Sequence, residues 1–295
     1  DDAILINAPS QIETVTYYYQ GPLPLYPLPL QRPLDRAETE RALQELVTRH
    51  GRIWAIYWAT EESDPQGLIE DWLDARCFKA SDRWYGNLRL ALYAVPQAAA
   101  SETMQPLEVV FGDAVRLQGY TLHTPHPVSG DVVQLTLYWE ALQPMEHRLK
   151  VFAHLVDARG HIVGQRDSEP GGGKSLTTSW PVGEMIADNY GLAIPAGAPP
   201  GEHILRIGLY GLDDGVRLPL TAGDGGLPDA LDLVTLWVQR APTPPAVASL
   251  DMDTADDRTW GAMHLLRHSL YPLGRRHEAT WQLHASEQGL PFGGV

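Results

Sequence analysis

The sequence predicts a small three-layer α/β domain, then an all-β immunoglobulin-like sandwich, then a partial β repeat at the C-terminus. Three observations lead to this fold class. Up to residue 96, apolar runs alternate with helical patterns, which is typical of an α/β layer. From residue 107 to 240 the helical period disappears, and strand-like runs follow one another between Gly/Pro turns, as in a β-sandwich. After a Pro-rich stretch at 241–248, the last segment resembles an earlier pair of strands.

The first domain is expected to contain a largely parallel sheet, because helical patterns separate its strands. The run RIWAIYW at 52–58 is apolar on both faces, which is typical of a central strand. Ser10, with Glu13 in a capping box, and Asp64 are the expected N-caps of the first and last helices. The expected strands are 3–7, 23–29, 52–58 and 88–95, and the expected helices are 10–19, 35–51 and 64–76.

The stretch TYYYQGPLPLYPLPL, from Thr16 to Leu30, joins the first helix to the second strand. Tyr17, Tyr18 and Tyr19 are expected to close the helix, and because neighbouring helical residues point about 100° apart, at least one ring should face outward. The prolines that follow remove backbone donors, so this strand is expected at the edge of the sheet. A Pro-x-x-P ligand, Pro24 to Pro27, is the alternative interpretation.

The second domain is expected to be built from about seven strands. They are 115–122, 132–139, 148–157, 161–167, 184–194, 202–211 and 231–239. The predicted domain bounds are 1–96 for the α/β domain, 97–106 for a linker, 107–240 for the sandwich, 241–262 for a Pro-rich and acidic linker, and 263–295 for the partial second repeat.

The repeat is an alignment of 263–286 with 115–140. In it Leu265 meets Leu117, Leu270 meets Leu122 and Leu283 meets Leu137; chance similarity of two strands is the alternative. Two strands cannot bury a core alone, so the repeat is expected to pack on the first sandwich or to pair with another chain.

Composition excludes several classes of protein. The formal charge of −15 offers no basic face to a nucleic acid. The single cysteine, Cys77, cannot form an intrachain disulfide or a thiolate cluster. No apolar run is long enough for a membrane helix, so the chain is expected to be soluble. An Asp-Asp start without signal-peptide features suggests a fragment or a processed form.

Several short motifs resemble chemical signatures without their context. GGGKS at 171–175 lacks the earlier glycine and the following helix of a phosphate loop, so a solvent loop is expected. DMD at 251–253 has the Asp-x-Asp form with which nucleotide-sugar transferases hold a metal, but so short a pattern arises easily by chance in an acidic linker. The pairs His123 with His126 and His264 with His268 lack the Glu of a zinc motif. We therefore expect no catalytic residue, no metal site and no cofactor.

Aromatic side chains are the remaining functional signal. Exposed rings can serve as stacking platforms for sugars, although rings in sandwich strands are more often core. Glu61 follows the central strand and so falls where α/β folds bind ligands, although an acidic first helical turn also explains it. The candidate ligand contacts are Tyr17, Tyr18, Tyr19, Trp58, Glu61, Trp139 and Trp180.

A family resemblance covers residues 1 to about 240. DDAILINAPSQIETVTYYYQGPLPLYPLP and the run from Arg52 to Pro96 resemble the soluble extracytoplasmic region that follows the membrane helices of bacterial family-39-like glycosyltransferases, relatives of the protein O-mannosyltransferases and the aminoarabinose transferase. FGDAVRLQGYTL, GDVVQLTLYWEALQP and KVFAHLVDARGHIVGQRDSEP resemble the β-sandwich appended to such enzymes in Chloroflexi-type bacteria.

The resemblance implies a non-catalytic extracytoplasmic accessory region of a polyprenyl-phosphate-sugar-dependent glycosyltransferase. Such a region would be tethered to the membrane part of the parent enzyme, would shape acceptor access, and would contact glycan or a neighbouring envelope protein. The family's catalytic residues lie in the membrane part, so none is carried over here. Two alternatives are a free-standing cell-surface or assembly protein that associates through its C-terminal strands, and a carbohydrate-binding module.

Overall fold

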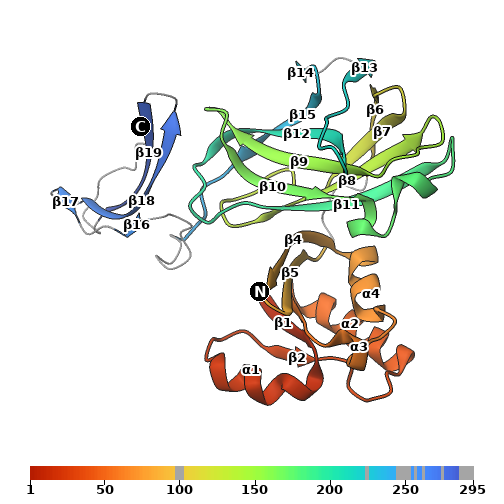
Figure 1. Ribbon diagram of the computed structural model, residues 1–295. Coiled ribbons are helices and arrows are strands. Elements are labelled where there is room, and N and C mark those ends of the chain that lie inside the picture. The colour runs from red at the N-terminus through yellow and green to blue at the C-terminus, as the bar shows by residue number, and fades with distance from the viewer. Residues whose placement is uncertain are drawn as a thin grey trace.

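A computed structural model gives the fold of the chain, and it describes residues 1–96, 103–222, 226–243, 254–255, 258–260, 263–273 and 276–285. An α/β domain is followed by a β-sandwich, which confirms the predicted fold class (Figure 1). A further hairpin of strands lies towards the C-terminus.

The N-terminal sheet has five strands in the order β2-β1-β3-β5-β4. Strand β3 is central and the proline-containing β2 lies at an edge, both as predicted. Only half of the sheet is parallel: β1 pairs in parallel with β2 and β3, whereas β5 runs antiparallel to β3 and β4. The expectation of a largely parallel sheet is thus wrong for this half. The strands are β1 (Asp2–Asn7), β2 (Leu25–Pro27), β3 (Arg52–Tyr57), β4 (Phe78–Tyr85) and β5 (Leu88–Ala94).

Helices cover both faces of this sheet. Ala3 and Leu5 of β1 point towards α2 and α4 and pack with Leu43 and Leu46 of α2. Ile4 and Ile6, which alternate with them, point to the opposite face and pack near α1. The helices are α1 (Ile12–Tyr18), α2 (Arg36–Arg49), α3 (Thr60–Ser63) and α4 (Leu68–Arg76), and the 3₁₀ turn η1 (Pro9–Gln11) precedes α1.

Helix starts differ in part from the prediction. Ser10 does not cap α1: it lies inside η1, which begins at Pro9, and the N-cap residue Gln11 makes no side-chain capping bond. Asp64 does cap α4, although Gly67 and not Asp64 holds the N-cap position. The two carboxylate oxygens of Asp64 accept hydrogen bonds from the backbone N–H groups of Leu68 and Ile69, each at 2.8 Å. A carboxylate here also compensates the positive end of α4.

The second domain consists of two five-stranded sheets. One has the order β11-β8-β7-β6-β13 and the other β10-β9-β12-β15-β14. The run β15-β12-β9-β10 corresponds to the G-F-C-C′ order of an immunoglobulin sheet. The strands are β6 (Gln105–Phe111), β7 (Val115–Leu122), β8 (Val132–Ala141), β9 (Leu149–Asp157), β10 (Ile162–Ser168), β11 (Met185–Ala193), β12 (Gly201–Gly211), β13 (Leu220–Ala222), β14 (Gly226–Leu227) and β15 (Ala230–Val238), with turns η2 (Pro170–Gly173) and η3 (Thr177–Ser179). All seven predicted strands are present, and β6, β13 and β14 are additional.

The sandwich covers the part of the N-terminal sheet that α1 leaves open. Phe78, Leu92 and Ala94 form a cluster with Val132 of β8, and Trp54 packs against both this cluster and the one beneath α1. Since Trp54 belongs to both, the sandwich and α1 lie on the same face of the sheet. Figure 1 shows β4 and β5 directly under β11. Hydrogen bonds also cross the boundary, as from Gln134 Nε2 to the Val95 carbonyl, 3.3 Å.

The C-terminal strands form a separate sheet, in which β18 (Met263–Leu273) pairs with β19 (Arg276–Ala285), β16 (Thr254–Ala255) and β17 (Thr259–Trp260). Leu265 lies opposite Leu283. In the first hairpin, Leu117 lies opposite Trp139, and Leu137 opposite Tyr120. The predicted pair of strands is therefore present, but its register is not that of the aligned segment.

Candidate functional site

The candidate site lies where β1 and β3 end, partly on the α1 side of the sheet and partly at the strand ends beside α4. The carboxyl ends of parallel strands are where α/β folds commonly bind ligands. Two hollows meet there, and Trp58, the residue after β3, lines both. We call them the apolar groove and the polar pocket.

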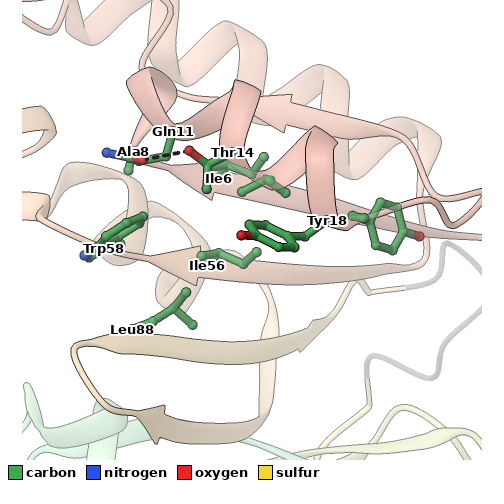
Figure 2. A pocket seen from close by; sticks show the side chains of 10 residues that line it. Ile6, Ala8, Gln11, Thr14, Tyr18, Ile56, Trp58 and Leu88 are labelled. Carbon is green, nitrogen blue, oxygen red and sulfur yellow. Dashed lines mark hydrogen bonds between the residues drawn. The ribbon is translucent and has the colours of Figure 1, made fainter.

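The apolar groove lies between α1 and the sheet and has a volume of about 320 Å³. Figure 2 shows Thr14 and Tyr18 of α1 along one side, and Ile56, Trp58 and Leu88 of the sheet along the other. It exists because α1 is short: it ends at Tyr18 and leaves the rows of β3 and β5 beside it uncovered. The remaining lining residues are Ile6, Ala8, Gln11, Val15 and Tyr19.

The polar pocket lies beyond Trp58, at the tip of the β4–β5 hairpin, and has a volume of about 400 Å³. Trp84 forms an aromatic wall and is 67% exposed. Thr60, Glu61 and Asn87 supply hydroxyl, carboxylate and amide groups. Tyr57, Ala59 and Arg89 complete the lining. The pocket lining thus combines two tryptophan residues with groups that donate and accept hydrogen bonds.

The backbone at the base of this pocket is bent sharply. Ala59 has φ 47° and ψ 44°, in the left-handed region that few residues other than glycine adopt. This turn joins β3 to α3 and places Thr60 and Glu61 directly beside Trp58. Backbone strain of this kind is concentrated at functional sites, although it also occurs elsewhere.

Arg89 is fixed beneath the polar pocket by two carboxylates. Its guanidinium pairs with Glu70 and, at 3.2 Å, with Asp82. It also stacks over the rings of Tyr57, at 4.6 Å from the centroid, and Trp84, at 5.7 Å. Its charge is therefore neutralised and its plane supports the Trp84 ring, so the pocket offers no free cation from this residue to an anionic ligand.

The ion-pair network continues inwards from Arg89. Lys79, only 5% exposed, lies 2.9 Å from Glu70 and 2.8 Å from Asp74. Burial alone would raise the pKa of Glu70, but the hydrogen bond from Arg89 and the charge of Lys79 outweigh it and lower that pKa to about 2. Glu70 is therefore an anion at neutral pH, and the network is a structural support rather than a proton donor.

The predicted contact residues divide into two groups. Tyr18, Tyr19 and Trp58 line the apolar groove, and Trp58 and Glu61 line the polar pocket. Tyr17 is 76% exposed and points away from the groove lining, which confirms that at least one ring of the tyrosine run faces outward. Trp139 and Trp180 belong to the sandwich core, are 0% and 6% exposed, and are not available to a ligand at this site.

The acidic residues after the central strand have three separate roles. Glu61 faces the polar pocket. Glu62 lies 3.8 Å from Arg32 in an exposed ion pair. Asp64 is the buried cap of α4. Of the three, only Glu61 is placed to meet a ligand.

The short motifs do not form further sites. The GGGKS loop lies between β10 and β11, where the Gly171 N–H donates to Asp188 and Lys174 pairs with Asp71 and Asp74 of α4, so it is more than a solvent loop. DMD lies outside the described residues, as do the side chains of His264 and His268. His123 bonds Thr136, 3.0 Å between Nε2 and Oγ1.

Other reactive groups are also accounted for. Cys77 is buried, and burial, followed by the charge of Asp74, raises its pKa to about 12, so it is not a nucleophile at neutral pH. Within the described ranges, no three His, Cys, Asp or Glu side chains are grouped to hold a metal ion. Across the same ranges, no helix combines the length and apolarity needed to cross a membrane.

Sequence reasoning missed Trp84, Asn87 and Arg89 because it missed β4. The signal was present: Gly86-Asn87 is a two-residue turn directly before a strand, which is typical of a β-hairpin. Gly86 has φ 64° in the structure, as such a turn requires. Recognising the turn would have placed Trp84 opposite Arg89, next to the end of β3.

Comparisons with known proteins give little to add. No protein-family model matches the chain, and no curated protein matches it. Among solved structures, the C-terminal domain of Wzt is similar to part of the chain, with a TM-score of 0.34 and 7% identity, over 50% of this chain and 83% of that domain. Similarity at this level carries no argument about function.

Proposed function

We propose that the chain is a non-catalytic carbohydrate-recognition region, and that it binds a sugar in the polar pocket. The observation that carries this proposal is the placement of Trp58 and Trp84 around Thr60, Glu61 and Asn87. The flat apolar face of a pyranose packs against an indole ring, while its hydroxyls need donors and acceptors at the rim.

Charge narrows the class of sugar. Arg89 is already paired with Glu70 and Asp82, and the exposed carboxylate in the pocket is Glu61. A phosphorylated or carboxylated sugar would meet this carboxylate without a free cation from Arg89. The pocket therefore favours a neutral or amino sugar.

Binding of the chain to a glycan array tests this proposal, with variants chosen for exposed side chains. Trp84→Ala should abolish the signal for the glycans that the wild type binds, and Trp58→Ala should weaken it at least tenfold. Trp237→Ala is the matched control, because Trp237 is 60% exposed but lies on β15 of the sandwich. If Trp84→Ala binds as the wild type does, the polar pocket is not the site.

The cellular setting is part of the same proposal. The family resemblance of residues 1 to about 240 supports an extracytoplasmic accessory region of a membrane glycosyltransferase, tethered through the parent enzyme and presenting the pocket to an acceptor glycan. The gene sequence upstream of Asp1 tests this: about ten membrane helices are expected there, and a short upstream region that encodes only a signal peptide would contradict it.

A second candidate function is self-association through the C-terminal strands, either in a free-standing surface protein or in the parent enzyme. The observation that favours it is the ten-residue ladder between β18 and β19, in which β19 has no second strand partner in the described part of the chain. Unpaired strand edges are sites of strand addition. Size-exclusion chromatography should show a dimer for 1–295 and a monomer for 1–243; a monomer for both would contradict it.

A further inference from the structure

We propose that the ligand is amphiphilic, a sugar bearing an apolar aglycone, with the sugar in the polar pocket and the aglycone in the apolar groove. This proposal rests on the proposed function and adds a ligand class to it. Trp58 belongs to the lining of both hollows, so a ligand that spans this residue meets both.

The lining of the apolar groove supports an apolar occupant. Its walls are aliphatic side chains and aromatic rings, among them Val15, Ile56 and Leu88. Its two polar side chains towards the start of α1 bond to each other, Thr14 Oγ1 to Gln11 Oε1 at 3.4 Å (Figure 2). For an occupant of this groove, burial of apolar surface contributes most of the binding free energy and hydrogen bonding contributes little.

Neither α1 nor the sandwich closes the apolar groove. Helix α1 ends at Tyr18, and the sandwich covers the other end of β4 and β5, at Phe78, Leu92 and Ala94. The groove lies between these two covers, so neither can close it without a rearrangement of the sheet. Trp58 connects it to the polar pocket, and this continuity is the reason for assigning it to the same ligand.

The polarity of the lining also fits an alkyl chain rather than a second sugar. The groove, about 320 Å³, is open along one side and has no carboxylate or amide besides Gln11 in its lining. Sugar hydroxyls placed there would lose hydrogen bonds to water without replacement. An alkyl or prenyl-type chain makes no hydrogen bonds to water and so loses none on entering the groove.

A chain-length series tests the proposal. The full chain is titrated calorimetrically with methyl, hexyl and octyl glycosides of glucose, galactose, mannose and glucosamine, all below their micelle concentrations. Each added methylene should tighten binding about two- to fourfold while the groove fills. If octyl and methyl glycosides bind equally, this inference is overturned and carbohydrate recognition stands.

Two variants locate the effect. Leu88→Asn should lower the ratio of octyl to methyl glycoside affinity, and Tyr18→Ser, at a 79% exposed position, should lower the same ratio without disturbing the core. Leu227→Asn is the control, because Leu227 is an exposed leucine on β14. A chain-length dependence equal to the wild type in both groove variants would overturn the inference.

A sugar-free probe separates this failure from that of the proposed function. Octyl tetraethylene glycol carries the same chain on a neutral head without a sugar. If it binds as tightly as the best octyl glycoside, the sugar is not recognised and both proposals are overturned. If it binds at least tenfold more weakly, the sugar and the chain are recognised together.

Discussion

Lys174 in the sandwich and Asp74 in α4 form an ion pair across the domain boundary, with 2.8 Å between Nζ and Oδ2. Lys174 also pairs with Asp71 of the same helix. Asp74 in turn contacts the buried Lys79 at 2.8 Å and accepts a hydrogen bond from the Tyr93 hydroxyl at 2.9 Å. A loop that resembles a phosphate-binding motif in sequence therefore links the sandwich to the ion-pair network beneath the polar pocket.

The first prediction concerns this link. Lys174→Ala should lower the free energy of unfolding by about 0.5–1 kcal/mol, because the side chain is 42% exposed and such pairs are weak. Urea denaturation measures it, and 0.5 M NaCl should reduce the difference from the wild type. Lys150→Ala on β9 is the control. An equal loss in both variants would show that Lys174 has no special role.

The second prediction concerns the buried lysine. Lys79→Met should cost about 3 kcal/mol or more, because Glu70 and Asp74 would lose a shared cation in a site where charges are poorly solvated. Thermal unfolding followed by circular dichroism measures the change. Adding Asp74→Asn should recover part of the loss, since it removes one of the two carboxylates that Lys79 neutralised. No recovery would mean that the cost arises from packing alone.

The third prediction concerns pH and Asp188. Burial raises the pKa of this 2% exposed carboxyl to about 6, although hydrogen bonds from Tyr190 and Gly171 oppose the shift. Because the folded pKa lies above the unfolded value of about 3.9, the folded state binds the proton more tightly, and stability falls as pH rises from about 4 to 6. The Asp188 contribution should thus make the protein more stable at pH 5 than at pH 7.

The measurement is the difference between wild type and Asp188→Asn in urea at each pH, because the neutral amide cannot ionise. The free energy of unfolding of the wild type, relative to that of Asp188→Asn, should fall by up to about 2–3 kcal/mol between pH 4 and pH 7. Glu70 acts in the opposite direction: with a pKa of about 2, it stabilises above pH 4.5, and its contribution is lost as pH falls towards 2. A difference that is constant over pH 4 to 7 would contradict the Asp188 assignment.

The fourth prediction concerns the close contact between β11 and β4. A Cβ on Gly191 would lie 2.9 Å from the Phe78 carbonyl oxygen and 3.0 Å from Ala80 Cα, so Gly191→Ala must push the two strands apart. We expect a loss of about 1–3 kcal/mol and faster proteolysis between the domains. Gly51→Ala is the control, because nothing lies within 4 Å of its added methyl group. Equal stability of the two variants would contradict the tight contact.

The fold class could be predicted from sequence because local patterns carry it. The strand RIWAIYW is apolar on both faces and is indeed central, and the prolines place β2 at the edge. The antiparallel addition of β5 and β4 was not predicted, because the Gly86-Asn87 turn was overlooked. Ser10 fits a capping box by residue type, but Pro9 starts a 3₁₀ turn that places it inside the turn.

The candidate site could be predicted only where it depends on one strand end. Trp58 and Glu61 follow the central strand, so their position near a crevice is inferable from the fold. The contribution of Trp84 depends on a hairpin, and that of Tyr18 on where α1 stops over the sheet. Trp139 resembles Trp58 in sequence setting but is buried, because the second sheet of the sandwich covers its face of β8.

Because the sandwich and α1 together cover one face of the N-terminal sheet, the two domains cannot be separated without exposing apolar side chains. The linker predicted at 97–106 suggests a cut between two modules, but a fragment ending at Pro96 would expose Phe78, Leu92 and Ala94, which the sandwich now buries. The smallest piece suited to crystallisation with a ligand, or to grafting the groove onto another protein, is therefore 1–243.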